Sequence, residues 1–350
     1  MASTRNFDDK ITYYFGAGAS ANAIPTVNGL MERLEDFGVF LSDMGNSIAN
    51  NSYGSQRLAD WTELGQFYGH WSNAIKGVPS LDTLAKRFYD QGKMDVYYEY
   101  KVFLVVLFNY LHKFKRLVSK SIRYTPNSLE GRYENLIRSI NLFDGTANIS
   151  KPIPDNFTFI TWNYDFHLEL TAFNDLQIDC GFYDAMHAKK DFLGLNIINL
   201  NGSSLVSNIY YEEKDPFSLL IEIFKYLKED PEKNPLKFAW EFKEENVNFL
   251  NNVAKESKYV VVIGYSFPSF NRDIDNSFFH KLNPGTKIFT QGYNYSDSVS
   301  IERYLRQTSP EINKHITITP VESPFFYVPA EYFLEKEKPL YTGITSFDLN

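Results

Sequence analysis

One short segment near the start of this sequence has the composition of a phosphate-binding turn. Gly16-Ala17-Gly18-Ala19-Ser20-Ala21 follows the apolar run of residues 11–15 and has the spacing G-x-G-x-x-A. Such glycines let the backbone approach a pyrophosphate, and the N–H groups that follow can bind it. A tight strand-to-helix turn with no ligand has the same sequence, so the motif alone leaves that alternative open.

A second segment carries an amide and a carboxylate two residues apart. Thr161-Trp162-Asn163-Tyr164-Asp165 ends the apolar run of residues 157–161. The Asn163 amide can donate and accept hydrogen bonds, and the Asp165 carboxylate can accept them, which suits the hydroxyls of a ribose. For Asp165 the competing interpretation is a cap on the helix that follows.

Two further segments place small residues after apolar runs. They are Asn199-Leu200-Asn201-Gly202-Ser203-Ser204 and Ile263-Gly264-Tyr265-Ser266-Phe267-Pro268. Ligands of α/β proteins bind at the carboxyl ends of parallel strands, where such turns meet. If the preceding runs are parallel strands, all four segments lie along one edge of a single sheet.

The pattern of runs predicts the elements that bring these segments together. Helical segments separate the strand-like runs, and this alternation favours a Rossmann-like parallel sheet with helices on both faces. Residues of about 40–150 read as a helical insert, with one helix over 95–120, inside a single domain that spans residues 1–350. The predicted strands are residues 11–15, 157–161, 196–200, 259–263, 287–290 and 316–319.

Composition limits the classes of function. The 350 residues are 43% hydrophobic and carry a net charge of −8, so direct nucleic-acid binding is not expected. The single cysteine, Cys180, fits a reducing cytoplasm and cannot build a four-cysteine metal site. Val102 to Phe108, the most apolar run, is too short to span a bilayer. A cytoplasmic protein without a membrane segment is therefore expected.

Taken in order, GAGAS, TWNYD, LNGSS and IGYS resemble the motifs of sirtuin-like NAD-binding proteins. They are most similar to those of the bacterial sirtuin-like NADases of anti-phage defence, over residues 11–295. The resemblance implies a hydrolase that cleaves NAD⁺ into nicotinamide and ADP-ribose and depletes cellular NAD in abortive infection. NAD is then the substrate, and no metal is required.

The resemblance also implies a role for each matching residue. Asn163 and Asp165 would hold the nicotinamide ribose and the attacking water. The turn residues Asn201 and Gly202 of the third motif would complete this cofactor site. The pyrophosphate would bind at Gly16, Ala17, Gly18 and Ser20, and the adenosine side at Gly264, Ser266 and Gln291.

The chain departs from the sirtuin deacylases in two ways. They carry a four-cysteine zinc ribbon, which this chain cannot form, and a helical insert takes its place. Their general base is a histidine directly before the glycine of the third motif, where this chain has Asn201, which cannot act as a base. His187 is the histidine we expect to serve, with His167 and Asn201 as the alternatives at the base position.

An unrestrained NADase would deplete its own cell, so its activity must be gated. The resemblance implies self-assembly into a homo-oligomer, or a separately encoded partner such as a HerA-type ATPase or an Argonaute-like protein. Two other functions stay open: a non-catalytic module that binds NAD or ADP-ribose, and an ordinary oxidoreductase. The latter would use Asp43, which follows the short run Val39-Phe40-Leu41, as its ribose-binding carboxylate.

Overall fold

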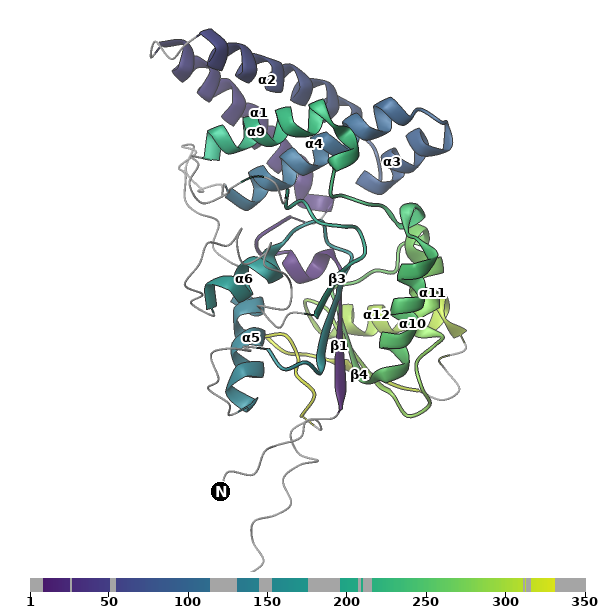
Figure 1. Ribbon diagram of the computed structural model, residues 1–350. Helices are drawn as coiled ribbons and strands as arrows, with labels where there is room; N and C mark the ends of the chain where they lie inside the picture. Colours follow the sequence, from purple (N-terminus) through teal and green to yellow (C-terminus); the bar gives the residue numbers. More distant parts are fainter. Residues whose placement is uncertain are drawn as a thin grey trace, which may run out of the picture.

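A six-stranded, all-parallel sheet forms the centre of the protein (Figure 1). The computed structural model describes residues 9–25, 27–50, 55–113, 131–144, 153–175, 196–206, 209, 216–310, 312 and 316–330. The strands are β1 (Lys10–Phe15), β2 (Phe157–Thr161), β3 (Asn196–Asn199), β4 (Ser257–Ile263), β5 (Lys287–Gln291) and β6 (Thr317–Val321). Their order, β3-β2-β1-β4-β5-β6, is that of Rossmann-like folds and confirms the predicted α/β sheet.

The strands form because their side chains are apolar on both faces. In β1, Tyr13 and Phe15 are buried in one core and Tyr14 in the core of the opposite face. In β4, Val260 to Ile263 are all buried. Strands buried on both faces read as continuous apolar runs rather than as alternating ones, which is why β1 and β4 stand out in the sequence. The edge strands β3 and β6 are only partly buried.

Helices cover both faces of this sheet, as predicted. They are α5 (Gly131–Asp144), α6 (His167–Asp175), α10 (Glu244–Glu256), α11 (Arg272–Phe279) and α12 (Tyr295–Thr308). Apolar residues of α5 and α6 share a core with Tyr13. Those of α10, α11 and α12 share the opposite core with Tyr14. Each face of the sheet therefore buries its own set of side chains.

A third layer, made of helices, lies over the carboxyl ends of the strands (Figure 1). It contains α1 (Val27–Asn50), α2 (Ser55–Ile75), α3 (Leu81–Asp90), α4 (Met94–Lys113) and α9 (Pro216–Glu229). Residues 102–111 of α4 are all buried and form its centre. Within the described residues, no helix has the length and apolar character to cross a bilayer.

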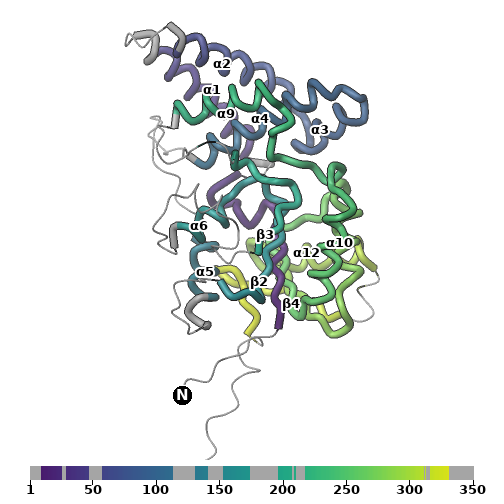
Figure 2. Tube along the Cα trace, in the orientation of Figure 1, coloured from purple at the N-terminus to yellow at the C-terminus, as the bar shows by residue number. Residues whose placement is uncertain are grey.

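The helical layer differs in extent from the insert predicted at residues 40–150. Its α9 comes from beyond β3 yet packs on α2 and α4, as the green tube beside the blue ones shows (Figure 2). By contrast, α5 lies in the predicted range but packs on the sheet. The predicted helix over 95–120 corresponds to α4 as far as Lys113, and residues 114–130 lie outside the described part of the chain.

Short 3₁₀ helices join these layers at η1 (Ala17–Ser20), η2 (Pro231–Lys233), η3 (Ala239–Glu241) and η4 (Ser269–Asn271). A buried ion pair connects η3 to the helical layer. Lys101 Nζ of α4 lies 3.0 Å from Glu241 Oε1, and the Lys101 side chain is 4% exposed. Glu241 also accepts a hydrogen bond from the backbone N–H of Phe238. The pair fixes α4 relative to the segment that leads into α10.

Three glycines let the turns after β1 and β4 touch. A Cβ on Gly16 would lie 2.6 Å from the carbonyl oxygen of Gly264, and one on Gly18 would lie 2.8 Å from the Gly264 Cα. Gly264 has a φ of +60°, a conformation that glycine adopts without strain. The Gly18 N–H donates to the Gly264 carbonyl at 3.0 Å. The backbones of the two turns are therefore in direct contact at the centre of the sheet, where β1 and β4 are neighbours.

Replacing Gly264 by alanine should destabilise the fold more than the same change at Gly77. Both glycines have a positive φ, which costs an alanine about 1 kcal/mol. A Cβ at Gly77 meets no atom within 4 Å, whereas one at Gly264 lies 2.5 Å from the Gly18 carbonyl carbon. Denaturant unfolding of both variants measures the difference, and equal losses of stability would contradict the close contact.

Candidate active site

A cavity of about 280 Å³ lies between the carboxyl ends of the strands and the helical layer. It is enclosed from two sides. Its sheet side is formed by residues that follow β1, β2, β3 and β4, including Ser20, Asn163, Asp165, Asn201 and Ser266. Its other side comes from the helical layer, including Leu30, Ser80, Asp82 and Phe108. All four sequence motifs therefore meet at one cavity.

Asn163 is held rigidly in the wall of this cavity. Its side chain is 5% exposed, and its Nδ2 donates to Ser20 Oγ at 3.1 Å. Its backbone N–H donates to Thr161 Oγ1 at 3.0 Å. The Asn163 Oδ1 is buried, and none of the described residues donates a hydrogen bond to it. A buried acceptor left in this way calls for a ligand or a water with a donor.

Asp165 caps a helix and also lines the cavity. Its Oδ1 accepts the backbone N–H of His167 at 3.1 Å, so the carboxylate caps the start of α6. The same residue lines the cavity and is 6% exposed. The cap fixes the Asp165 carboxylate in the wall of the cavity.

The third motif is tied into the backbone around the cavity. Asn201 Nδ2 donates to the carbonyl of Trp162 at 2.7 Å, and the Asn201 carbonyl accepts the N–H of Lys237. Gly202 has a φ of +66°, and a Cβ there would lie 2.0 Å from the Pro235 carbonyl oxygen. Asn201 lines the cavity, whereas Gly202 does not. The conformation of Gly202 lets the backbone pass close to Pro235.

A second cavity, of about 520 Å³, adjoins the first on the side of β5. The two share the segment Gly264 to Ser266, and Gly18 lines the second. Gln291, predicted on the adenosine side, also lines it. However, Gln291 Nε2 donates to the carbonyls of Ser323 and Phe325, so its amide anchors the segment after β6.

Several backbone N–H groups of the glycine turn donate hydrogen bonds within the protein. The N–H of Gly16 donates to Ile263, and that of Gly18 donates to Gly264. The N–H groups of Ala19 and Ala21 bond within the turn. Few N–H groups are therefore left for a phosphate, and the glycines are required first by the contact with the turn after β4.

Asp82 reaches the cavity from the helical layer, a position that sequence reasoning missed. Ser80 caps α3 through a 3.1 Å bond from the Thr83 N–H, which places Asp82 in the first helical turn. The Tyr164 hydroxyl donates to Asp82 Oδ1. Burial raises the pKa of the Asp82 carboxyl above its usual value. Ser80 before the helical spacing of Leu81, Leu84 and Ala85 is the sequence signal that could have placed Asp82 in a first helical turn.

The histidine candidates have different outcomes. His187 lies outside the described residues. His167 begins α6 and is 1% exposed, and its ring packs against that of His112 with centroids 4.4 Å apart. His167 does not belong to the cavity wall described above.

Asp43, the carboxylate considered for an oxidoreductase, does not follow a strand. Val39, Phe40 and Leu41 lie in α1 rather than in a strand, because Leu30, Leu34, Phe37 and Leu41 share one buried helical face. Asp43 is an exposed residue of the same helix. The second strand is β2, so the acidic residue after the second strand is Asp165.

A fully buried carboxylate holds two aromatic residues of the cavity wall. Asp275 of α11 accepts hydrogen bonds from Tyr14 at 2.6 Å, Tyr265 at 2.8 Å and Trp162 Nε1 at 3.1 Å. Burial raises the pKa of Asp275 to about 7, although the three donors oppose this shift. One side chain thus links the ends of β1, β2 and β4.

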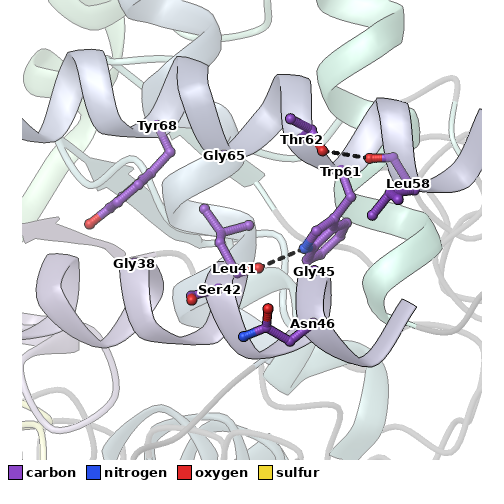
Figure 3. A pocket seen from close by; sticks show the side chains of 10 residues that line it. All are labelled: Gly38, Leu41, Ser42, Gly45, Asn46, Leu58, Trp61, Thr62, Gly65 and Tyr68. Atoms are coloured by element: carbon purple, nitrogen blue, oxygen red, sulfur yellow. Dashed lines mark hydrogen bonds between the residues drawn. The ribbon is translucent and has the colours of Figure 1, made fainter. Parts of the chain in front are cut away.

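A separate groove of about 510 Å³ lies between α1 and α2 in the helical layer (Figure 3). Gly38, Gly45 and Gly65 leave room for it. Trp61 Nε1 donates to the Leu41 carbonyl at 2.8 Å, so its polar atom is already engaged. None of the ten residues drawn in Figure 3 is charged. These ten residues therefore offer no carboxylate, amine or imidazole for acid–base catalysis.

Comparisons with known proteins add no family to this description. No protein-family model matches the chain, and no curated protein matches it. Among the residues that the structure describes, no three His, Cys, Asp or Glu side chains gather as metal ligands. The case for a function therefore rests on the geometry of the two cavities.

The Asp275 network predicts a pH dependence of stability. The folded protein holds the Asp275 proton more tightly than the unfolded chain does. The free energy of unfolding therefore falls as the pH rises from 3.8 to about 7. The slope is at most about 1.4 kcal/mol per pH unit. Asp275→Asn removes this contribution. The unfolding midpoint of the variant should therefore rise relative to that of the wild type as the pH increases across that range. A difference that stays constant with pH would contradict the assignment.

Proposed function

We propose that this protein hydrolyses NAD⁺ to nicotinamide and ADP-ribose. The observation that carries the proposal is the buried Oδ1 of Asn163, to which no described residue donates, in the wall of a cavity at the carboxyl ends of the strands. A ribose hydroxyl is a donor of the kind that this oxygen lacks. The ordered series of motifs that resembles sirtuin-like NADases supports the same ligand.

The chemistry asks for positioning more than for reactive groups. Cleavage of the nicotinamide–ribose bond builds oxocarbenium character on the ribose, as in glycoside hydrolysis. Asn163 and Asp165 would orient the ribose and the attacking water, because both are fixed by hydrogen bonds before any ligand arrives. Nicotinamide leaves with the bonding electron pair, water adds to the ribose carbon, and one proton is released.

The two cavities also suit a dinucleotide. They meet at Gly264 to Ser266, so a ligand can extend from the Asn163 cavity toward β5. The smaller cavity would take the nicotinamide ribose and the larger one the ADP portion. The diphosphate would then cross the segment that both share.

Proton removal does not depend on residue 201 in this proposal. Asn201 is engaged with the Trp162 carbonyl, while the carboxyls of Asp82 and Asp165 line the same cavity. Burial raises the pKa of the Asp82 carboxyl, so it holds a proton more readily than an exposed carboxyl does. His187, which lies outside the described residues, stays the proposed base.

We further propose that the enzyme acts in the cytoplasm in an abortive-infection defence. Its gate would be self-assembly or a separately encoded partner, a HerA-type ATPase or an Argonaute-like protein, as the resemblance implies. The helical layer supports such gating, because it contributes Ser80, Asp82 and Phe108 to the cavity. A shift of this layer would reshape the site directly.

A non-catalytic module that binds NAD or ADP-ribose is the second candidate. The observation that favours it is Asn201, which stands where deacylases have a base and which holds the backbone instead. Incubation of the purified chain with NAD⁺, followed by chromatography, separates the two functions. Release of free nicotinamide supports the hydrolase, and binding without turnover supports the module.

Asn163→Ala should lower nicotinamide release by about 10²-fold or more, because the ribose loses its positioning contact. Asn248→Ala, an exposed asparagine of α10, provides the matched control. Unfolding midpoints of both variants verify that each is folded. Full turnover by a folded Asn163→Ala enzyme would exclude Asn163 from the mechanism.

A further inference from the structure

The second cavity gathers three kinds of group that no sequence motif indicated. Arg132 of α5 contributes a cation, Asp297 of α12 a carboxylate, and Tyr293 and Tyr304 aromatic rings. Among the described residues that line it, Arg132 is the one basic side chain and Asp297 the one acidic side chain. These groups differ from those around Asn163, and they call for a ligand with its own chemistry.

Arg132 is fixed at the glycine turn. Its Nη2 donates to the carbonyls of Ala19 at 3.1 Å and Gly18 at 3.4 Å. Its guanidinium lies 5.0 Å from the centre of the Phe326 ring. The turn itself keeps few N–H groups for an anion, because Gly16 and Gly18 donate theirs to the turn after β4. Positive charge for a diphosphate therefore comes from the arginine.

Asp297 lines the cavity from the first turn of α12, after β5. Its backbone N–H donates to the capping Asn294 Oδ1 at 2.9 Å. Gly292 packs so closely that a Cβ there would lie 2.3 Å from the Asp297 Cβ. Ser298, the next residue, bonds to the Val321 carbonyl at 2.7 Å. The backbone of Asp297 is thus fixed in the first turn of α12.

Two tyrosines offer exposed aromatic faces at the same cavity. Tyr293 is 87% exposed and Tyr304 is 40% exposed. Large aromatic side chains exposed beside a cavity are stacking surfaces for a planar base. Base, ribose and diphosphate are the three parts of an ADP group, and the cavity has a matching group for each.

We propose that the second cavity selects NAD⁺ over NADP⁺, with Arg132 binding the diphosphate and Asp297 accepting the 2′-hydroxyl of the adenosine ribose. This inference rests on the proposed function for the identity of the ligand. A carboxylate at the 2′-position accepts from a hydroxyl and repels a 2′-phosphate. Arg132 donates to the carbonyls of the glycine turn, and we assign its charge to the diphosphate.

The test of Asp297 compares ligands that differ only at the 2′-position. Wild-type protein should bind ADP about tenfold more tightly than 2′-deoxy-ADP. Asp297→Asn should reduce that ratio toward one and should narrow the preference in kcat/KM for NAD⁺ over NADP⁺. Glu302→Gln is the control, because it removes a carboxylate of α12 that does not line the cavity.

The test of Arg132 compares ligands with and without the diphosphate. Arg132→Gln should weaken ADP binding by about tenfold and leave adenosine binding unchanged. Arg132→Lys keeps the charge and should retain part of the ADP affinity. Arg138→Gln on the same helix controls for loss of an exposed arginine. Equal weakening of ADP and adenosine would mean a collapsed turn and would overturn the role of Arg132.

The outcomes separate this inference from the proposed hydrolase. If ADP and 2′-deoxy-ADP bind equally to the wild type, Asp297 does not read the 2′-position, even when nicotinamide is released. If the ligand ratios behave as stated but no nicotinamide appears, the ADP site stands and hydrolysis fails. Binding is measured on the full chain, with unfolding midpoints for every variant.

Discussion

The site depends on one backbone contact, between the turn after β1 and the turn after β4. These strands are neighbours in the sheet, yet the chain leaves them in different directions, toward the helical layer and toward α11. Gly16, Gly18 and Gly264 allow the turns to touch without side chains between them. The cavities flank this contact and share Gly264 to Ser266. The glycines therefore shape the ligand space by letting backbones meet, a role separate from direct phosphate binding.

Beneath that contact, a buried carboxylate lies within the apolar packing. Asp275 is fully buried, and Tyr14, Tyr265 and Trp162 donate to it from three different strand ends. A buried carboxylate is costly unless its oxygens are bonded, and these donors offset that cost. The result is a fixed position for Trp162, whose carbonyl in turn accepts from Asn201. The fixed position of Trp162 also restrains Asn163, the next residue in the chain.

The sequence allowed the sheet to be predicted because buried parallel strands have local signatures. Residues 259–263 are β-branched or aromatic throughout, and the structure has them in β4. The same reasoning failed at Val39 to Leu41, where a short apolar run belongs to one face of α1. Arg132 and Asp297 could not be found in this way, because they are 165 positions apart in the chain and only the fold brings both to one cavity. Local patterns indicate strands and turns, whereas cavities are products of long-range packing.

The helical layer is more than an insertion beside a catalytic sheet. It replaces a wall that the sheet cannot provide, since the carboxyl ends of parallel strands are open on the side away from the sheet. Tyr164 lies between Asn163 and Asp165 in the chain, and its hydroxyl binds Asp82 of the layer. Lys101 and Glu241 connect the same layer to the segment before α10 through a buried pair. Any movement of the layer must therefore break or carry along bonds that reach the strand ends. In the proposed enzyme, this coupling would let a partner that binds the layer alter the geometry of the site.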